Sequence, residues 1–195
     1  MNPAFKIGLQ LYGIQNDFRR DSGGVLRKLA DWGCQGIEFL PRMGPDPGAL
    51  AAAVRRYGME AMGYYAFEPE RLADPADAVY AELDGLGVRH VTVGFSGHVE
   101  ARWLEAVDWV RRIADVAGGR GVTVHYHNHE PELQLVQGRP ALDILAERTD
   151  ADRMRFELDT YMLAKAGQDP VAWIERFAGR MSRLHVKDLR RSDGA

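Results

Sequence analysis

The sequence lacks several features that mark particular classes of protein. Its 195 residues include a single cysteine, Cys34, which excludes an internal disulfide and fits a reducing compartment. No apolar run approaches the roughly 20 residues that span a bilayer. The first residues also lack the basic and apolar regions of a signal peptide. We therefore expect a cytoplasmic protein without a membrane partner.

An excess of charge and the common phosphate-binding motifs are missing too. The net charge is −3 and the isoelectric point about 6.1, without the basic stripe that nucleic-acid-binding proteins usually show. Neither GxGxxG nor GxxxxGK(S/T) occurs, so neither type of nucleotide-binding loop is expected. With 46% hydrophobic and 27% charged residues, the composition is ordinary for a soluble globular protein.

Short apolar runs alternate with longer helix-like segments along the chain. We predict strands at Lys6–Tyr12, Gly36–Leu40, Ala61–Tyr65, His90–Gly94, Val122–His127, Arg155–Asp159 and Leu184–Lys187. We predict helices near Ser22–Trp32, Pro47–Tyr57, Pro69–Leu86, Glu100–Gly119, Arg139–Arg148 and Pro170–Ala178. This alternation is typical of repeated βα units and a parallel sheet.

The junctions between these segments agree with the alternation. Glycine tolerates the left-handed conformation in which helices commonly stop, and Asp-Pro suits a helix start. Four glycines are expected to end helices: Gly33, Gly58, Gly87 and Gly121. Three Asp-Pro pairs are expected to begin them: Asp46-Pro47, Asp74-Pro75 and Asp169-Pro170.

Seven strands of this kind without a phosphate loop favour a TIM (β/α)8-type barrel over a doubly wound sheet. Eight-stranded barrels typically need about 250 residues, and this chain stops just after its seventh predicted strand. We therefore expect residues 1–195 to form one α/β barrel domain that is incomplete. About seven strands are present, and a C-terminal strand eight with its helices is absent.

Polar side chains gather at the carboxyl ends of the predicted strands, where barrels of this kind place their active sites. The stretch Val122–Glu130, VTVHYHNHE, carries three histidines two residues apart, which share one face of a strand. The candidates from all strand ends are Gln10, Tyr12, Glu38, Tyr64, Tyr65, His125, His127, His129, Glu157, Asp159, His185 and Lys187.

Three of these residues, His127, Asp159 and His185, come from three different strand ends and predict a divalent-metal site. Imidazole with carboxylate suits Mn, Zn, Co or Fe better than Mg, although Mg stays open. His125 lies deeper in its strand and is expected to be a core residue. Lys187 beside a metal would hold an anionic oxygen, and Glu38 is either a solvated strand-end acid or a functional one.

The combined motifs resemble the xylose isomerase-like TIM barrels, the sugar phosphate isomerase/epimerase superfamily. They are IGLQLYGIQ, WGCQGIEFL, VHYHNHE, FELDTYMLAKAGQDPVAWI and RMSRLHVKDLR, in the same order as in the family. The resemblance implies one divalent metal held by His127, Asp159, His185 and a glutamate from strand eight. That fourth ligand has no counterpart before Ala195, so we expect this polypeptide alone to bind metal weakly.

The activity implied by the resemblance is proton transfer next to a carbonyl of a sugar or polyol, through a metal-stabilised enediolate. The candidates for the base that moves the proton are His129, Glu38 and Glu157. Lys187 and Asn128 are expected to orient oxygens, and Gln10, Tyr12 and Tyr64 to contact the substrate. The favoured reading is a sugar isomerase or epimerase.

Three alternatives remain open from the sequence. A lyase or dehydratase acting on an inosose or a 3-keto sugar would use the same metal site. An apurinic endonuclease fits less well, because the third and fourth strands end in GYYAF and VTVGF, without histidine. The negative net charge also disfavours a nucleic-acid partner. A non-catalytic sugar-binding fragment is the third alternative, and a homo-oligomer is compatible with all of them.

Overall fold

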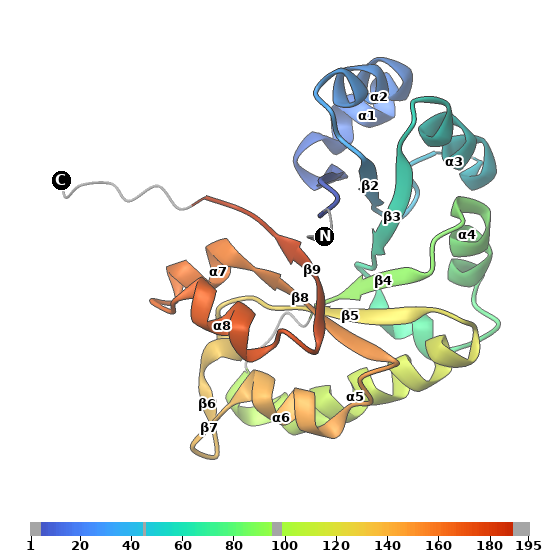
Figure 1. Cartoon of the computed structure of the whole chain (residues 1–195). Coiled ribbons are helices and arrows are strands. Elements are labelled where there is room, and N and C mark those ends of the chain that lie inside the picture. The colour runs from blue at the N-terminus through green and yellow to red at the C-terminus, as the bar shows by residue number, and fades with distance from the viewer. Residues whose placement is uncertain (1–4, 45, 95–98, 189–195) are drawn as a thin grey trace. The chain divides into compact units, whose positions relative to one another are not determined.

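The computed structural model describes residues 5–44, 46–94 and 99–188 (Figure 1). The chain divides into two compact units, residues 1–91 and residues 92–195. Strand β4, His90–Val93, spans the boundary between the units. The expectation of one domain over residues 1–195 stays a prediction.

In the first unit, strands β1, β2 and β3 run parallel in this order. They span Gly8–Gln10, Gly36–Phe39 and Glu60–Tyr65. The helices are η1 Leu11–Ile14, α1 Gln15–Arg20, α2 Ser22–Asp31, α3 Pro47–Arg56, η2 Pro69–Ala73 and α4 Ala78–Leu86. Gln10 pairs in register with Glu38, which places both side chains on one face at the strand ends.

The first strand is shorter than the sequence predicts. It ends at Gln10, and the chain turns at once into η1 and α1, two short helices that the prediction missed. The sequence QNDFRR of α1 is polar and buries only Phe18, so it gives little helical periodicity. Tyr12 therefore lies in η1, beyond the strand.

The predicted helix Pro69–Leu86 is two elements, and the expected start at Asp74-Pro75 is wrong. Helix α4 begins at Ala78, because the carboxylate of Asp77 accepts a hydrogen bond from the Val79 amide at 2.8 Å. Asp74 instead accepts from the Ala76 amide at 2.9 Å, within the turn that precedes the helix. Sequence alone did not separate the two aspartates, because both suit a helix start.

We expect Asp77→Ala to lower the thermal midpoint by roughly 2–4 °C more than Asp74→Ala. The Asp77 substitution removes the α4 cap and also the two hydrogen bonds that Arg71 donates, at 2.7 and 3.2 Å. Thermal unfolding followed by circular dichroism measures both variants. Equal shifts, or a larger one for Asp74→Ala, would place the functional cap at Asp74.

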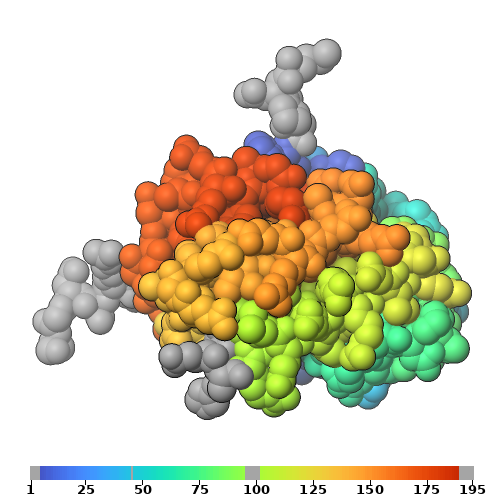
Figure 2. Space-filling view, turned by 90° about the horizontal axis from the view of Figure 1, so that it is seen from below, coloured from blue at the N-terminus to red at the C-terminus, as the bar shows by residue number. Residues whose placement is uncertain are grey.

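In the second unit, strands β5, β8 and β9 run parallel in this order. They span Thr123–His127, Met154–Asp159 and Met181–His185. The other elements are α5 Val99–Gly119, η3 Pro131–Leu133, β6 Leu135–Val136, β7 Arg139–Pro140, α6 Ala141–Arg148, α7 Thr160–Lys165 and α8 Pro170–Arg176. Helices α5 and α6 lie side by side (Figures 1 and 2).

A buried aromatic pair joins this helix layer to the strands of the second unit. Trp103 of α5 donates its indole N–H to the Ala141 carbonyl at 2.7 Å and meets the ring of Tyr126 edge to face. Both aromatic side chains are buried. Because Tyr126 alternates with His125 and His127 along β5, its packing fixes which way the histidines point.

The fold class predicted from the sequence is confirmed. Seven strands, β1 to β5 with β8 and β9, alternate with helices, and the described residues contain no eighth strand of this series. The four expected helix-ending glycines all adopt positive φ, between 71° and 79°. No helix in the described parts of the chain combines the length and the apolar character needed to cross a membrane.

Candidate functional site

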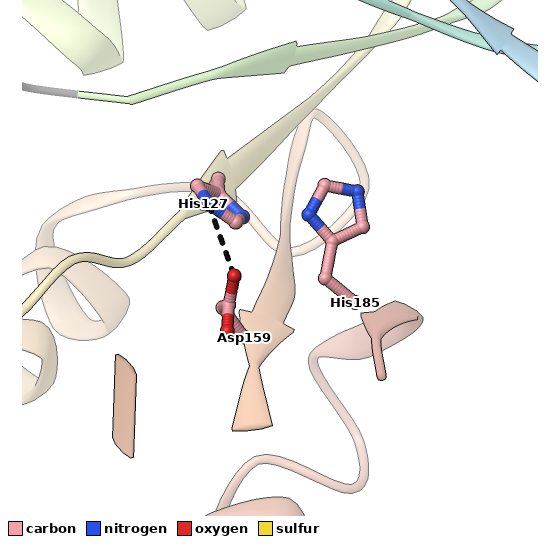
Figure 3. A group of neighbouring side chains, drawn as sticks. All are labelled: His127, Asp159 and His185. Carbon is pink, nitrogen blue, oxygen red and sulfur yellow. Dashed lines mark ion pairs between the residues drawn. The ribbon is translucent and has the colours of Figure 1, made fainter. Parts of the chain in front are cut away.

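The last residues of three neighbouring strands form a compact cluster in the second unit. His127 ends β5, Asp159 ends β8 and His185 ends β9, and the register sets Asp159 opposite His185. His127 Nε2 lies 3.7 Å from Asp159 Oδ2, and the two imidazole centroids are 4.6 Å apart (Figure 3). One ligand atom from each residue lies within 4.8 Å of the others.

The donor set of this cluster fits a divalent metal. Burial, followed by the electrostatic influence of the neighbouring His185 and His129 side chains, lowers the pKa of His127 to about 3. The imidazole is therefore neutral near pH 7, which is the form that binds a metal. Two imidazoles and a carboxylate match the preference of Zn, Mn, Fe and Co. The role of these residues as ligands stays a prediction.

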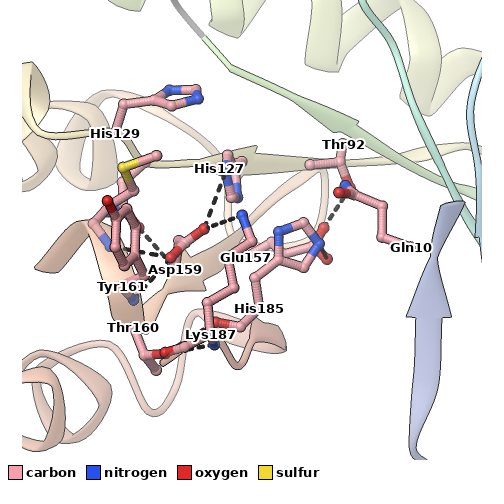
Figure 4. Close-up of polar contacts among 12 residues, drawn as sticks. Gln10, Thr92, His127, His129, Glu157, Asp159, Thr160, Tyr161, His185 and Lys187 are labelled. Atoms are coloured by element: carbon pink, nitrogen blue, oxygen red, sulfur yellow. Dashed lines mark hydrogen bonds and ion pairs between the residues drawn. The ribbon is translucent and has the colours of Figure 1, made fainter. Parts of the chain in front are cut away.

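The two carboxylate oxygens of Asp159 make different contacts, one with a helix N-terminus and the other with the cluster. Oδ1 caps helix α7, accepting from the amides of Tyr161 at 2.9 Å and Met162 at 3.1 Å. Oδ2 faces His127 and accepts from Lys187 Nζ at 2.6 Å (Figure 4). The cap prevents the carboxylate from rotating, so Oδ2 is the oxygen available to a ligand.

Lys187 and Asn128 both form hydrogen bonds with Asp159. Asn128 precedes Asp159 in the sequence, and Lys187 follows it. Lys187 lies two residues beyond β9, and its backbone is held by Thr160 Oγ1 at 3.0 Å. Asn128 is buried, and its Oδ1 accepts from the Asp159 amide at 2.9 Å, which joins the end of β5 to the end of β8. Substrate contact by Asn128, predicted from the sequence, stays a prediction beside this supporting contact.

Glu157 supports His185 from within the sheet. His185 Nε2 lies 2.9 Å from Glu157 Oε1, and Thr92 donates its hydroxyl to Glu157 Oε2. Burial by itself would raise the pKa of Glu157, but the hydrogen bond and charge of His185 outweigh it and hold that pKa at about 2. An ionised Glu157 held in this way orients His185. Its predicted role as a base stays untested.

The remaining candidates of the second unit are His125 and His129. His125 is fully buried, and its Nδ1 lies 3.5 Å from Ser182 Oγ, in keeping with the expected core position. His129 lies beyond the end of β5 and keeps 32% of its side chain exposed. Its ring stands edge to face with that of His127, with centroids 5.0 Å apart.

The other predicted residues lie in the first unit. Gln10 donates to Glu38 Oε2 at 2.9 Å, and both belong to neighbouring strand ends. Tyr64 is buried, and its hydroxyl donates to Glu82 at 3.0 Å; burial and this carboxylate raise its pKa above the ordinary range. Tyr12 is 61% exposed. The predicted substrate contacts of Gln10, Tyr12 and Tyr64 remain predictions, as does the predicted role of Glu38 as a base.

Sequence reasoning missed three residues around the cluster: Thr92, Thr160 and Glu132. Thr92 lies in a segment that carries none of the family motifs, and Thr160 lies in one, next to Asp159, but the sequence pattern assigned it no role. Only the tertiary contacts bring Thr92 to Glu157 and Thr160 to Lys187. Glu132 did carry a signal, since it follows His129 by three residues in a polar stretch.

We expect stability to fall as the pH is lowered from about 6.5 towards 3. Because His127 titrates near 3 in the folded chain and near 6.5 when unfolded, the unfolded state binds more protons across that window. The free energy of unfolding then decreases by up to about 1.4 kcal/mol per pH unit from this group. Glu157 adds a loss of the same sign between about 4.5 and 2.

Urea unfolding at several pH values measures this dependence. A His127→Gln variant lacks the titrating imidazole, so its stability should change less between pH 4 and 6.5 than that of the unchanged chain. Parallel curves for the two proteins would show that His127 does not supply the effect.

The chain is similar to known proteins over nearly its whole length. An inosose dehydratase from Geobacillus kaustophilus is 26% identical, and the match covers 97% of this chain and 71% of that protein. A sugar phosphate isomerase/epimerase structure from Parabacteroides distasonis gives a TM-score of 0.79 at 21% identity, over 96% of this chain and 79% of that one.

A structure of a probable 3-DHS dehydratase from Bacillus anthracis gives a TM-score of 0.72 at 16% identity, over 97% of this chain and 75% of that one. These two solved structures share the fold at identities too low to carry function. The family model described as xylose isomerase-like TIM barrel matches residues 26–195. Since that match covers most of the sequence, the chain belongs to the xylose isomerase-like TIM barrel family.

Proposed function

We propose that the chain carries the metal-binding part of an enzyme site that removes the proton next to a carbonyl group. The substrate would be a small sugar or polyol ketone, and dehydration of an inosose-type ketone is the first candidate reaction. The observation that carries this proposal is the cluster of His127 and Asp159, both buried, with the partly buried His185, in which Lys187 Nζ lies 2.6 Å from Asp159 Oδ2.

Different residues of the chain would bind the metal, stabilise the negative oxygen and accept the proton in such a reaction. A divalent cation held by His127, Asp159 and His185 would supply Lewis acidity at the carbonyl and hydroxyl oxygens of the substrate. Lys187 places a positive charge at the same edge, where it can pair with the oxygen that becomes negative. His129, partly exposed beside His127, is the group that accepts the proton from carbon.

Dehydration is favoured over the other outcomes because the Geobacillus kaustophilus relative is named an inosose dehydratase and matches 97% of this chain. In that reaction the C–H electron pair forms a carbon–carbon double bond, and a neighbouring hydroxyl leaves and takes up a proton to become water, so that the substrate loses one H and one OH in all. Isomerisation or epimerisation is the second candidate, supported by the Parabacteroides distasonis structure, which is named a sugar phosphate isomerase/epimerase. Both begin with the same proton removal.

A deuterium-exchange assay tests the shared step and then separates the products. The purified protein is incubated with Mn²⁺ in D₂O and with inososes, 3-keto sugars or ketoses, and followed by proton NMR. We expect metal-dependent loss of the signal next to the carbonyl, with water elimination from an inosose. A product of inverted configuration would instead favour epimerisation. No exchange with any substrate would contradict the proposal.

A further inference from the structure

Glu132 is a fully buried carboxylate in η3 that none of the steps above uses. Its Oε1 accepts a hydrogen bond from the hydroxyl of Tyr126 at 3.0 Å, and its Oε2 accepts from the backbone amide of His129 at 3.1 Å. Both oxygens of the carboxylate therefore accept hydrogen bonds, and these two contacts fix the orientation of the group. Burying such a group is costly unless its contacts return the free energy.

The ring of His129 is turned towards this carboxylate. Its Nδ1 lies 3.7 Å from Glu132 Oε1, about half an ångström beyond ordinary hydrogen-bond length. That nitrogen is buried and has no hydrogen-bond partner among the described residues, although 32% of the side chain is exposed. The exposed part of the ring therefore lies away from Nδ1. The rings of His129 and His127 stand edge to face, with centroids 5.0 Å apart.

We propose that Glu132 is a positioning residue, which holds the His129 ring with its hydrogen on Nδ1 and so leaves Nε2 as the proton acceptor. The inference rests on the proposed function, in which His129 takes the proton from carbon. The new N–H bond forms at Nε2, the C–H electron pair stays on the substrate, and Nδ1 keeps its hydrogen. No proton passes to Glu132.

The geometry supports this reading for a physical reason. A carboxylate on one imidazole nitrogen selects the tautomer and fixes the ring plane, as in catalytic and metal-binding histidines generally. Tyr126 belongs to β5 and packs against Trp103, so Glu132 is anchored to the strand rather than to the loop alone. The simpler alternative is that Glu132 only stabilises the turn through the His129 amide.

The first test reads the tautomer of His129 without metal or substrate. Long-range ¹H–¹⁵N NMR at about pH 8.5, with the signal assigned by its loss in His129→Gln, distinguishes hydrogen on Nδ1 from hydrogen on Nε2. We expect the Nδ1–H form in the unchanged chain and a shift towards the Nε2–H form in Glu132→Gln. An Nε2–H tautomer in the unchanged chain overturns the proposal, even if the variant does not fold.

The second test measures exchange kinetics in the D₂O assay. Glu132→Gln should lower kcat by roughly 10–100-fold with little change in KM, and should add no further loss in a His129→Gln background. Glu130→Gln is the matched control, since Glu130 lies in the same loop and pairs with Lys165 at the surface. Equal additional loss in the His129→Gln background would assign Glu132 to the turn alone.

The two tests fail in different ways. If the proposed function is wrong, no substrate exchanges its proton, yet the tautomer measurement still reports on Glu132 and His129. If only the positioning role is wrong, exchange proceeds and the tautomer does not depend on Glu132.

Discussion

Asp159→Asn is expected to weaken the binding of Mn²⁺ or Zn²⁺ by at least about 100-fold, more than the loss of a residue that only supports a ligand. The amide keeps the size of the side chain, but it offers a single oxygen for two tasks. That oxygen either caps α7 at Tyr161 and Met162 or faces His127. In the capping arrangement an NH₂ group points at Lys187 Nζ, where a carboxylate oxygen now accepts.

The matched control for this experiment is Asp169→Asn. Asp169 is the exposed N-cap of α8 and accepts from the Val171 amide at 2.9 Å, so the same substitution tests the cap without the cluster. Calorimetric titration of the two variants and the unchanged chain gives the three affinities. An unchanged affinity in Asp159→Asn, or an equal loss in the control, would remove Asp159 from the ligand set.

His185→Ala is expected to abolish turnover, with a loss in kcat/KM of about 1,000-fold or more. This corresponds to about 4 kcal/mol of transition-state stabilisation. The substitution removes one of the two imidazole ligands and leaves the buried Glu157 without the ring that lies 2.9 Å from its Oε1. Because a buried polar group that loses its partner destabilises a fold by about 1–3 kcal/mol or more, thermal unfolding must show that the variant is folded in the assay.

A second substitution separates the two roles of His185. The amide of Gln in His185→Gln can still donate to Glu157, so the fold should be retained while the imidazole ligand is lost. Low activity in both variants, with near-normal stability in His185→Gln, supports the ligand role. Turnover retained in His185→Ala would remove the metal mechanism altogether.

The sequence predicted the cluster of His127, Asp159 and His185 because the information that places each residue at a strand end is local. The pattern of two-residue alternation placed His127 and Asp159 at strand ends on the functional face, and the structure brings both together with His185. The helix-ending glycines were equally predictable, because only the left-handed region of φ is required at each of them. Such features depend on the residue and its near neighbours.

Other features depended on the register between strands. Pairing shifts between Phe156 and Glu157, so that Phe156 lies opposite Met181 while Asp159 lies opposite His185. Without this irregularity Asp159 would pair with Leu184, and the ligand side chains would not meet. The sequence of one strand does not show where its pairing with the neighbouring strand becomes irregular.

The two-residue alternation of β5 does not extend to His129, although the sequence pattern suggested that it did. The strand ends at His127, so His129 lies in the following turn and faces Glu132 instead of continuing the row. Helix α7 went unpredicted for a related reason: it starts on the side chain of Asp159, directly after a strand, without a separating loop.

The sequence by itself therefore determined the family, the order of the seven parallel strands along the chain, and three residues that converge at the strand ends. Tertiary structure alone decided which oxygen of Asp159 faces the cluster, which carboxylate holds His185, and that Glu132 is buried against His129. The physical reason is distance along the chain. Burial and hydrogen bonding between residues far apart in sequence leave no period or spacing for a sequence pattern to reveal.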